Sequence, residues 1–154
     1  MNKKRICLVA SSGGHIEELM QLDFLRKEYD YSVVVPRTKW TEKIEGRKYY
    51  VKDLDRRNKI TKIFSFVFMV IEQFPIFFKE KPDVVVTTGA AVAIPIGIIS
   101  KIFNKKLIYI ESICRVKTRS KTGNFFYNKA DLFIVQWPEQ LKCYPDAIYG
   151  GKIY

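Results

Sequence analysis

A glycine pair and a histidine follow the first strongly apolar run of the sequence, in a pattern that could bind an anion. The run Ile6–Ala10 leads into residues 11–15, Ser-Ser-Gly-Gly-His, and a helical stretch follows. Glycines let the backbone approach a ligand closely, and a helix N-terminus offers unpaired N–H groups and a positive dipole end. A phosphate or a sugar oxygen would fit there. An ordinary strand-to-helix turn is the alternative, and the loop matches neither the dinucleotide nor the P-loop fingerprint.

His15 is the one histidine of the chain. An imidazole titrates near neutral pH, so this side chain could accept a proton from a hydroxyl group during catalysis. In the alternative, His15 is structural and caps the helix or donates to a nearby carbonyl group.

Two more polar clusters follow apolar runs. Thr87-Thr88-Gly89 comes after three valines and suits either a second site for an oxyanion or sugar, or simply a tight turn. Glu111 and Ser112 directly follow the run Leu107–Ile110. A carboxylate there can accept hydrogen bonds from substrate hydroxyls or orient a base.

A basic segment comes next in the chain. Residues 115–121 hold Arg115, Lys117, Arg119 and Lys121, four cations without an acid. They could bind a phosphate group or an anionic bilayer. A solvated basic loop is the alternative.

The stretch Ile60–Phe78 is apolar on almost every side of a helical wheel, and lysines bracket it. This pattern suits a membrane interface or contact with a partner protein, and burial against a sheet and a partner subunit is the competing explanation. Pro75 should kink or end the helix near Phe74. The candidate contact residues are Phe64, Phe66, Phe68, Phe74, Phe77 and Phe78.

The elements that would position these residues are short β-branched runs alternating with helical segments. Runs that are apolar on both faces are typical of parallel strands covered by helices on each side. The sequence therefore predicts a doubly wound, Rossmann-like α/β fold, in which ligands bind at the carboxyl ends of the strands. We expect strands at Arg5–Ala10, Tyr31–Pro36, Tyr49–Lys52, Asp83–Thr87, Lys106–Ile110 and Asp131–Val135, and helices at His15–Lys27, Lys59–Lys81, Ala91–Phe103 and Lys121–Lys129.

Composition excludes several classes of protein. The 154 residues carry 27 Lys and Arg against 16 Asp and Glu, a net charge of +11, and 47% are hydrophobic. We expect a single domain over residues 1–154 rather than a disordered chain. Cys7, Cys114 and Cys143 are far apart, which argues against a disulfide scaffold or a zinc site and for a reducing cytoplasm. The positive charge favours a polyanionic partner.

Neither a signal peptide nor a membrane-spanning segment is expected. The N-terminal apolar run stops after five residues, and the longest uncharged run, from Val84 to Ser100, has 17 residues, just under the length of a spanning helix.

Four segments in order resemble one protein family. They are residues 11–20 with Gly-Gly-His, residues 81–90 with Thr88-Gly89, residues 108–112 with Glu111, and residues 144–151. The family is the membrane-associated subunit of split UDP-sugar glycosyltransferases. Its eukaryotic member acts in dolichol-linked oligosaccharide synthesis. Its bacterial members assist a separate galactosyl- or N-acetylglucosaminyltransferase subunit in capsule and exopolysaccharide synthesis.

More distantly, the Gly-Gly-His loop is similar to that of the peptidoglycan lipid II N-acetylglucosaminyltransferase, a two-domain GT-B enzyme whose N-terminal domain receives the lipid-linked acceptor. The resemblance implies that this chain corresponds to that half, and that a partner similar to the C-terminal half binds the UDP-sugar. Eukaryotic relatives carry an N-terminal membrane helix, whereas Ile6–Ala10 already reads as a strand here. We therefore expect a cytoplasmic protein, peripheral on the inner face of the cell membrane and attached through Ile60–Phe78 and basic residues.

The resemblance implies an inverting, metal-independent transfer to an undecaprenyl-diphosphate-linked saccharide. Galactose is the first guess for the sugar, and N-acetylglucosamine is the other. His15 would be the base, and Glu111 the substitute base or the group that orients it. No cofactor is expected besides the UDP-sugar donor. The candidate substrate-binding residues are Ser12, Gly13, Gly14, Thr88, Gly89, Ser112, Arg56, Arg57, Arg115, Lys117 and Arg119.

Two other functions stay open. The chain could be a non-catalytic module that recruits and activates a catalytic partner, with a structural His15. Nucleic-acid binding is suggested by charge alone, but the sequence holds no helix-turn-helix, RNP or zinc motif, and we expect no nucleic-acid partner.

Overall fold

The computed structural model describes residues 3–55 and 57–154. These residues form a seven-stranded parallel sheet with the order β3-β2-β1-β4-β5-β6-β7. The strands are β1 Arg5–Ala10, β2 Asp30–Pro36, β3 Arg47–Val51, β4 Val84–Gly89, β5 Lys106–Ile110, β6 Leu132–Val135 and β7 Ile148–Tyr149.

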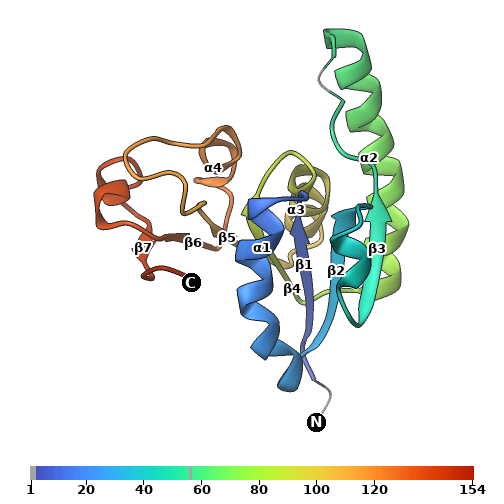
Figure 1. The fold of residues 1–154 in the computed structure, drawn as a ribbon, viewed down its shortest axis with the longest axis horizontal. Coiled ribbons are helices and arrows are strands. Elements are labelled where there is room, and N and C mark those ends of the chain that lie inside the picture. Colours follow the sequence, from blue (N-terminus) through green and yellow to red (C-terminus); the bar gives the residue numbers. More distant parts are fainter. Residues whose placement is uncertain (1–2, 56) are drawn as a thin grey trace.

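Helices cover both faces of the sheet (Figure 1). On one face lies α1 (Gly14–Met20), which the 3-10 helix η1 (Gln21–Lys27) continues. On the other face lie α2 (Lys59–Glu80), α3 (Ala93–Ile102) and α4 (Lys121–Phe126). Two shorter 3-10 helices are η2 (Thr41–Lys43) and η3 (Pro138–Lys142). The predicted doubly wound α/β fold is confirmed.

The central strands are apolar on both faces because each face has its own core. In β1, Cys7 and Val9 belong to the cluster beneath α2 and α3, whereas Ile6 and Leu8 belong to the cluster beneath α1. A strand in this position must be a continuous apolar run, which is the pattern that the sequence shows. Burial raises the pKa of the Cys7 thiol to about 12, so this cysteine is a packed, unreactive side chain.

The strand order reverses between β1 and β4. β2 pairs with one side of β1 and β4 with the other, and the register of β1 against β4 shifts between Val9 and Ala10, so that Ala10 lies opposite Gly89. The two loops that follow these strands therefore open next to each other. In sheets of this type, ligands bind in the crevice at such a switch point.

Helix α2 extends well past the carboxyl edge of the sheet (Figure 1). Its 22 residues span about 33 Å, whereas the six residues of β1 span about 20 Å. The predicted helix Lys59–Lys81 is found as Lys59–Glu80, so of the two effects expected of Pro75, a kink or an end near Phe74, the end does not occur. Ile71, whose carbonyl loses its partner there, and Pro75 are both exposed, so solvent can satisfy that group.

Three further differences concern short elements. The second half of the predicted helix His15–Lys27 is 3-10 from Gln21 onward, and the predicted helix Lys121–Lys129 ends at Phe126. The strand β7 was not predicted, because its two residues are exposed and too few to show a pattern.

Candidate functional site at the carboxyl edge of the sheet

The loop after β1 forms an accessible turn in front of His15. Gly13 has a φ of +85°, and its carbonyl accepts the N–H groups of Ile16 and Glu17, which starts α1. Gly13 and Gly14 are exposed and Ser12 is half-buried. Backbone groups of these residues are therefore open to a ligand beside the imidazole.

The carboxyl end of β4 fixes the position of His15. The hydroxyl of Thr88 donates a 2.6 Å hydrogen bond to the His15 carbonyl, and Thr88 is fully buried. Gly89 has a φ of +113°, and a Cβ there would lie 2.9 Å from the Tyr109 hydroxyl oxygen and 3.5 Å from Cε1 of His15. Thr88 and Gly89 thus hold His15 in place, and the Thr88 hydroxyl donates its hydrogen bond within the protein.

The His15 ring has a buried side and an accessible side. Its Nδ1 atom is buried and has no hydrogen-bond partner within the part of the chain that the structure describes. The residue as a whole is half-buried. Because Nδ1 faces inward, Nε2 is the nitrogen that can meet a ligand.

Glu111 is fully buried and accepts hydrogen bonds on both oxygens. Oε2 accepts from the hydroxyls of Tyr144 (2.6 Å) and Ser120 (3.0 Å), and Oε1 accepts from the N–H of Ser112 (2.9 Å). Burial and the nearby Glu111 carboxylate raise the pKa of Tyr144 and of Tyr109. Because both oxygens accept hydrogen bonds from other parts of the chain, Glu111 joins the segments at this edge of the sheet, and its roles as substitute base or as the group that orients His15 stay predictions.

Glu18 is a second buried carboxylate at this edge, one helical turn after His15. Its Oε1 atom accepts from the Ser112 hydroxyl (2.9 Å) and from the Ile113 N–H (3.1 Å). Burial raises the pKa of Glu18, against the effect of these hydrogen bonds. These two hydrogen bonds join α1 to the loop after β5. The hydroxyl of Ser112, a predicted substrate contact, thus donates to Glu18.

The predicted phosphate-binding cations differ in how many contacts they make within the protein. Arg119 lies over the rings of Tyr127 and Tyr144, 5.4 and 5.0 Å from their centroids, and donates to the Cys143 carbonyl. Arg115 and Lys117 are exposed on the same loop.

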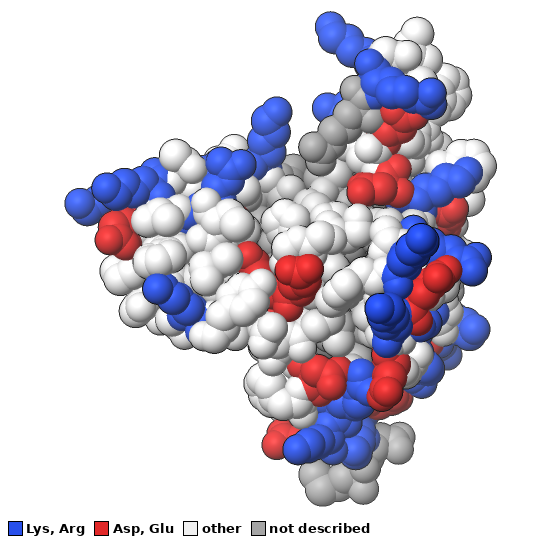
Figure 2. Space-filling model, in the orientation of Figure 1, with Lys and Arg blue, Asp and Glu red and all other residues white. Residues whose placement is uncertain are grey.

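Arg57 lies at the other side of the carboxyl edge, before α2. It is 81% exposed and pairs with Asp55 at 2.7 Å. Arg56, also a predicted contact, lies outside the described residues. Figure 2 shows Lys and Arg side chains around the protruding end of α2 and around the loop before α4, with largely uncharged surface between them.

Most of the predicted aromatic contacts on α2 lie on the surface. Phe64, Phe68, Phe74 and Phe78 are exposed and Phe66 is half-buried. Phe77 must be corrected: it is 3% exposed, because it faces the core beside Phe103. α2 is long and apolar enough to cross a membrane by length and composition, and only 17% of its most apolar window is buried.

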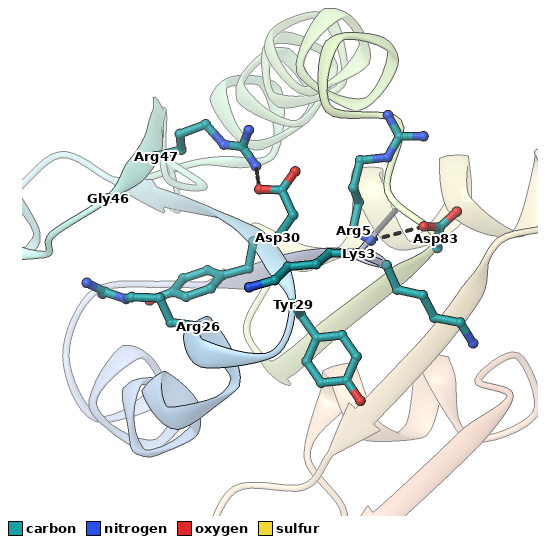
Figure 3. A pocket seen from close by; sticks show the side chains of 10 residues that line it. Lys3, Arg5, Arg26, Tyr29, Asp30, Gly46, Arg47 and Asp83 are labelled. Carbon is teal, nitrogen blue, oxygen red and sulfur yellow. Dashed lines mark hydrogen bonds and ion pairs between the residues drawn. The ribbon is translucent and has the colours of Figure 1, made fainter. Parts of the chain in front are cut away.

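A hollow of about 890 Å³ lies at the opposite, amino edge of the sheet (Figure 3). Two of its acidic residues bond to other residues of the lining: Arg47 bonds to Asp30, and the backbone N–H of Arg5 donates to the Asp83 carboxylate. None of the predicted site residues lines it.

Sequence reasoning missed five residues of the site: Glu18, Tyr109, Ser120, Gly123 and Tyr144. A Cβ on Gly123 would overlap Glu111 Oε2, so the glycine lets α4 approach that carboxylate. Tyr144 opens the fourth segment that carries the family resemblance, which was the available signal. Glu18 stands in the first of these segments, directly after an exposed glutamate.

Comparison with known proteins identifies relatives along nearly the whole chain. Residues 6–153 match the family described as "Oligosaccharide biosynthesis protein Alg14 like". The Homo sapiens protein named UDP-N-acetylglucosamine transferase subunit ALG14 is 30% identical, over 96% of this chain and 82% of its own length. The Rattus norvegicus protein of the same name is 28% identical over the same shares.

Solved structures share the fold at low sequence identity. Acinetobacter baumannii MurG superposes with a TM-score of 0.74 at 16% identity, over 88% of this chain and 42% of the MurG chain. A UDP-N-acetylglucosamine 2-epimerase from Rickettsia bellii gives 0.72 at 12%, over 99% and 46%. The chain thus spans less than half of these proteins, and the predicted likeness to one half of a GT-B glycosyltransferase is confirmed for the fold.

Proposed function

The chain belongs to the family of Alg14-like oligosaccharide biosynthesis proteins, and from this premise we propose that it is the acceptor-binding subunit of a split UDP-sugar glycosyltransferase. The relatives' names, UDP-N-acetylglucosamine transferase subunits, favour N-acetylglucosamine as the transferred sugar over galactose. The observation that carries the proposal is His15 behind the exposed Gly13–Gly14 turn at the switch point of the sheet.

A partner would supply the donor site. This chain matches less than half of MurG, so a second chain similar to the other half would bind the UDP-sugar. The carboxyl edge, with the loops that hold His15 and Ser112, would face that partner across the site. No cofactor beyond the UDP-sugar is needed for this reaction.

The transfer requires proton removal from the acceptor. As the acceptor hydroxyl oxygen bonds to the anomeric carbon, the bond from that carbon to UDP breaks and UDP leaves with the electron pair. The hydroxyl proton passes to Nε2 of His15, the nitrogen that the fold leaves accessible. Gly13 and Gly14 backbone groups would position the acceptor, and Arg115 and Lys117 would meet its diphosphate.

Helix α2 would attach the protein to the membrane without crossing it. Met69, Gln73 and Ile76 are buried, and the Gln73 side chain bonds to the Val92 carbonyl (2.9 Å) and the Ile96 N–H (3.0 Å), which fastens α2 to α3. The opposite side carries a continuous apolar stripe at helical spacing. Such a helix suits a position in the plane of the interface. The exposed stripe comprises Ile60, Ile63, Phe64, Val67, Ile71, Phe74 and Phe78.

The carrier lipid and the pathway stay predictions from the sequence resemblance. They are an undecaprenyl diphosphate carrier, capsule or exopolysaccharide synthesis, and the cytoplasmic side of the cell membrane. A lipid-linked acceptor is consistent with the position of the site, since α2 protrudes past the carboxyl edge of the sheet (Figure 1).

The test is sugar transfer in membranes that contain this chain, the partner subunit, or both. Radiolabelled UDP-N-acetylglucosamine and UDP-galactose are supplied with endogenous lipid acceptor. We expect transfer of N-acetylglucosamine only when both chains are present, and its loss with His15→Ala. The control is Glu17→Gln, an exposed residue on the same helix. Transfer by either chain alone would contradict the split site.

The same experiment tests the alternative function, a non-catalytic module that recruits and activates a catalytic partner. If His15→Ala kept full activity in the assembled complex, this chain would be a recruiting and activating module and not part of the catalytic site.

A further inference from the structure

We propose that Glu18 is a positioning residue for His15: its carboxylate accepts a hydrogen bond from Nδ1–H of the imidazole and thereby leaves Nε2 as the base. The inference rests on the proposed function and names a residue that the sequence did not single out.

The burial of Glu18 calls for a reason. The side chain is 1% exposed, and a buried carboxylate is costly unless it is bonded. Ser112 and Ile113 satisfy Oε1, but Oε2 is buried and lacks a partner among residues 3–55 and 57–154. The two hydrogen bonds favour the ionised form that an Nδ1–H donor would need, whereas burial opposes it and raises the pKa of Glu18.

The second unpartnered atom lies on the same helix. Within the described chain, three buried side-chain polar atoms lack partners: Nδ1 of His15, Oε2 of Glu18 and Nε2 of Gln140. His15 and Glu18 are three residues apart on α1, a spacing that puts side chains about 5–6 Å apart at Cβ. A donor and an acceptor that are both buried and unfilled this close complement each other, through a small rotamer change or one bridging water.

The other groups around the ring are less suited to this role. Both oxygens of Glu111 are engaged, by Tyr144, Ser120 and Ser112. The Tyr109 hydroxyl lies near the ring but bonds to Ser120 at 3.2 Å.

Three further groups lie near Glu18. Glu17 is exposed on α1, and Cys114 is exposed on the loop after β5. Tyr154, at the C-terminus, is also exposed, and burial and then the charge of Glu18 raise its pKa. None of the three is buried with Nδ1.

This arrangement has a defined consequence for the reaction. When Nε2 takes the proton of the acceptor hydroxyl, His15 becomes a cation with hydrogens on both nitrogens. The Glu18 carboxylate would then stabilise the buried Nδ1–H of this cation and keep the ring aimed at the turn. Glu18 itself exchanges no proton.

Nitrogen NMR of the full chain tests the proposal, and the single histidine makes its signals unambiguous. We expect the neutral ring of the wild-type protein to carry its hydrogen on Nδ1, and Glu18→Gln to abolish that preference. Glu17→Gln is the matched control and should leave the spectrum unchanged. A wild-type ring with its hydrogen on Nε2 would overturn the proposal without any variant, as would an unchanged tautomer in Glu18→Gln.

Activity of the assembled complex gives the second readout. Glu18→Gln should lower kcat about 100-fold with little change in the KM for the acceptor. An unchanged kcat would also overturn the proposal. If the wild-type complex transferred no sugar, the proposed function would fail, while the NMR result would still decide whether Glu18 positions His15.

Discussion

The hydroxyl of Tyr144 donates a 2.6 Å hydrogen bond to Oε2 of Glu111, 33 residues earlier in the chain. Both side chains are fully buried. The bond ties the segment after β6 to the end of β5, next to the loop that carries Ser112. The carboxyl edge of the sheet is therefore assembled by a buried polar network as well as by apolar packing.

Tyr144→Phe should destabilise the protein, because it leaves the buried Glu111 carboxylate without its shortest hydrogen bond. Loss of one partner of a buried charged group costs about 1–3 kcal/mol. Urea denaturation measures the change, with Tyr149→Phe as the control at an exposed tyrosine. Equal stability of the two variants would show that the hydroxyl of Tyr144 contributes little.

Gly89→Ala should reduce transferase activity by moving His15. The new Cβ would lie 2.9 Å from the Tyr109 hydroxyl and 3.5 Å from the His15 ring, at a φ of +113°. Gly46→Ala is the matched control, since Gly46 has a φ of +86° with open space around its Cβ position. Both variants strain the backbone, but we expect only Gly89→Ala to lower kcat at temperatures where both are folded.

Phe64→Glu should weaken membrane binding. Phe64 is 67% exposed on the apolar stripe of α2, and a carboxylate there would meet the hydrocarbon boundary of the bilayer. Flotation with vesicles containing anionic lipid measures binding, and rising salt should weaken it. Phe24→Glu is the control, because Phe24 is 61% exposed on η1, on the other face of the sheet. Equal flotation of both variants would contradict attachment through α2.

The sequence predicted the layers of this fold better than it predicted the contacts of the site. Strands buried on both faces, such as β1 and β4, contain apolar runs, so their type and their alternation with helices along the chain could be inferred. Glu18 could not, because it falls outside the apolar arc formed by Ile16, Leu19 and Met20 on a helical wheel. Its burial depends on Ser112 and Ile113, more than 90 residues away.

The sequence could not predict which hydroxyl groups of the candidate site already have a hydrogen-bond partner within the protein. Thr88 and Ser112 have side chains that suit a sugar, yet each donates to another part of the protein, to the His15 carbonyl and to Glu18. Hydroxyl groups at a buried sheet edge need partners in the folded chain, and nothing in their spacing identifies which partner they find.

Asp131 should make the protein less stable in acid. Burial opposes its ionisation, but hydrogen bonds from Lys101, the Leu107 N–H and Lys106 outweigh burial and lower the pKa of Asp131 to about 2. A carboxyl group with a lowered folded-state pKa stabilises the fold above its unfolded value and loses that contribution as pH falls toward the folded value. We expect a loss on the order of 1 kcal/mol between about pH 4 and pH 2. Asp131→Asn should lack this part of the acid dependence in thermal unfolding, and an unchanged dependence would contradict the assignment.

Arg115 and Arg119 should respond differently to substitution, although they are only four positions apart in one basic loop. Arg119 lies over two tyrosine rings and donates to the Cys143 carbonyl, so Arg119→Ala should lower the stability of the fold by removing packing and a hydrogen bond. Arg115 contacts only the Thr118 hydroxyl, at 3.4 Å, among its described hydrogen bonds. Arg115→Ala combined with Lys117→Ala should therefore leave the unfolding temperature unchanged.

If Arg115 and Lys117 bind the diphosphate of the acceptor, the double variant should have a several-fold higher KM for the lipid acceptor and a nearly unchanged kcat. A charge that binds substrate and transition state equally affects KM alone. The same measurements on Arg119→Ala provide the contrast, with a lowered unfolding temperature and an unchanged KM for the folded fraction. An unchanged KM in the double variant would assign diphosphate binding to other residues.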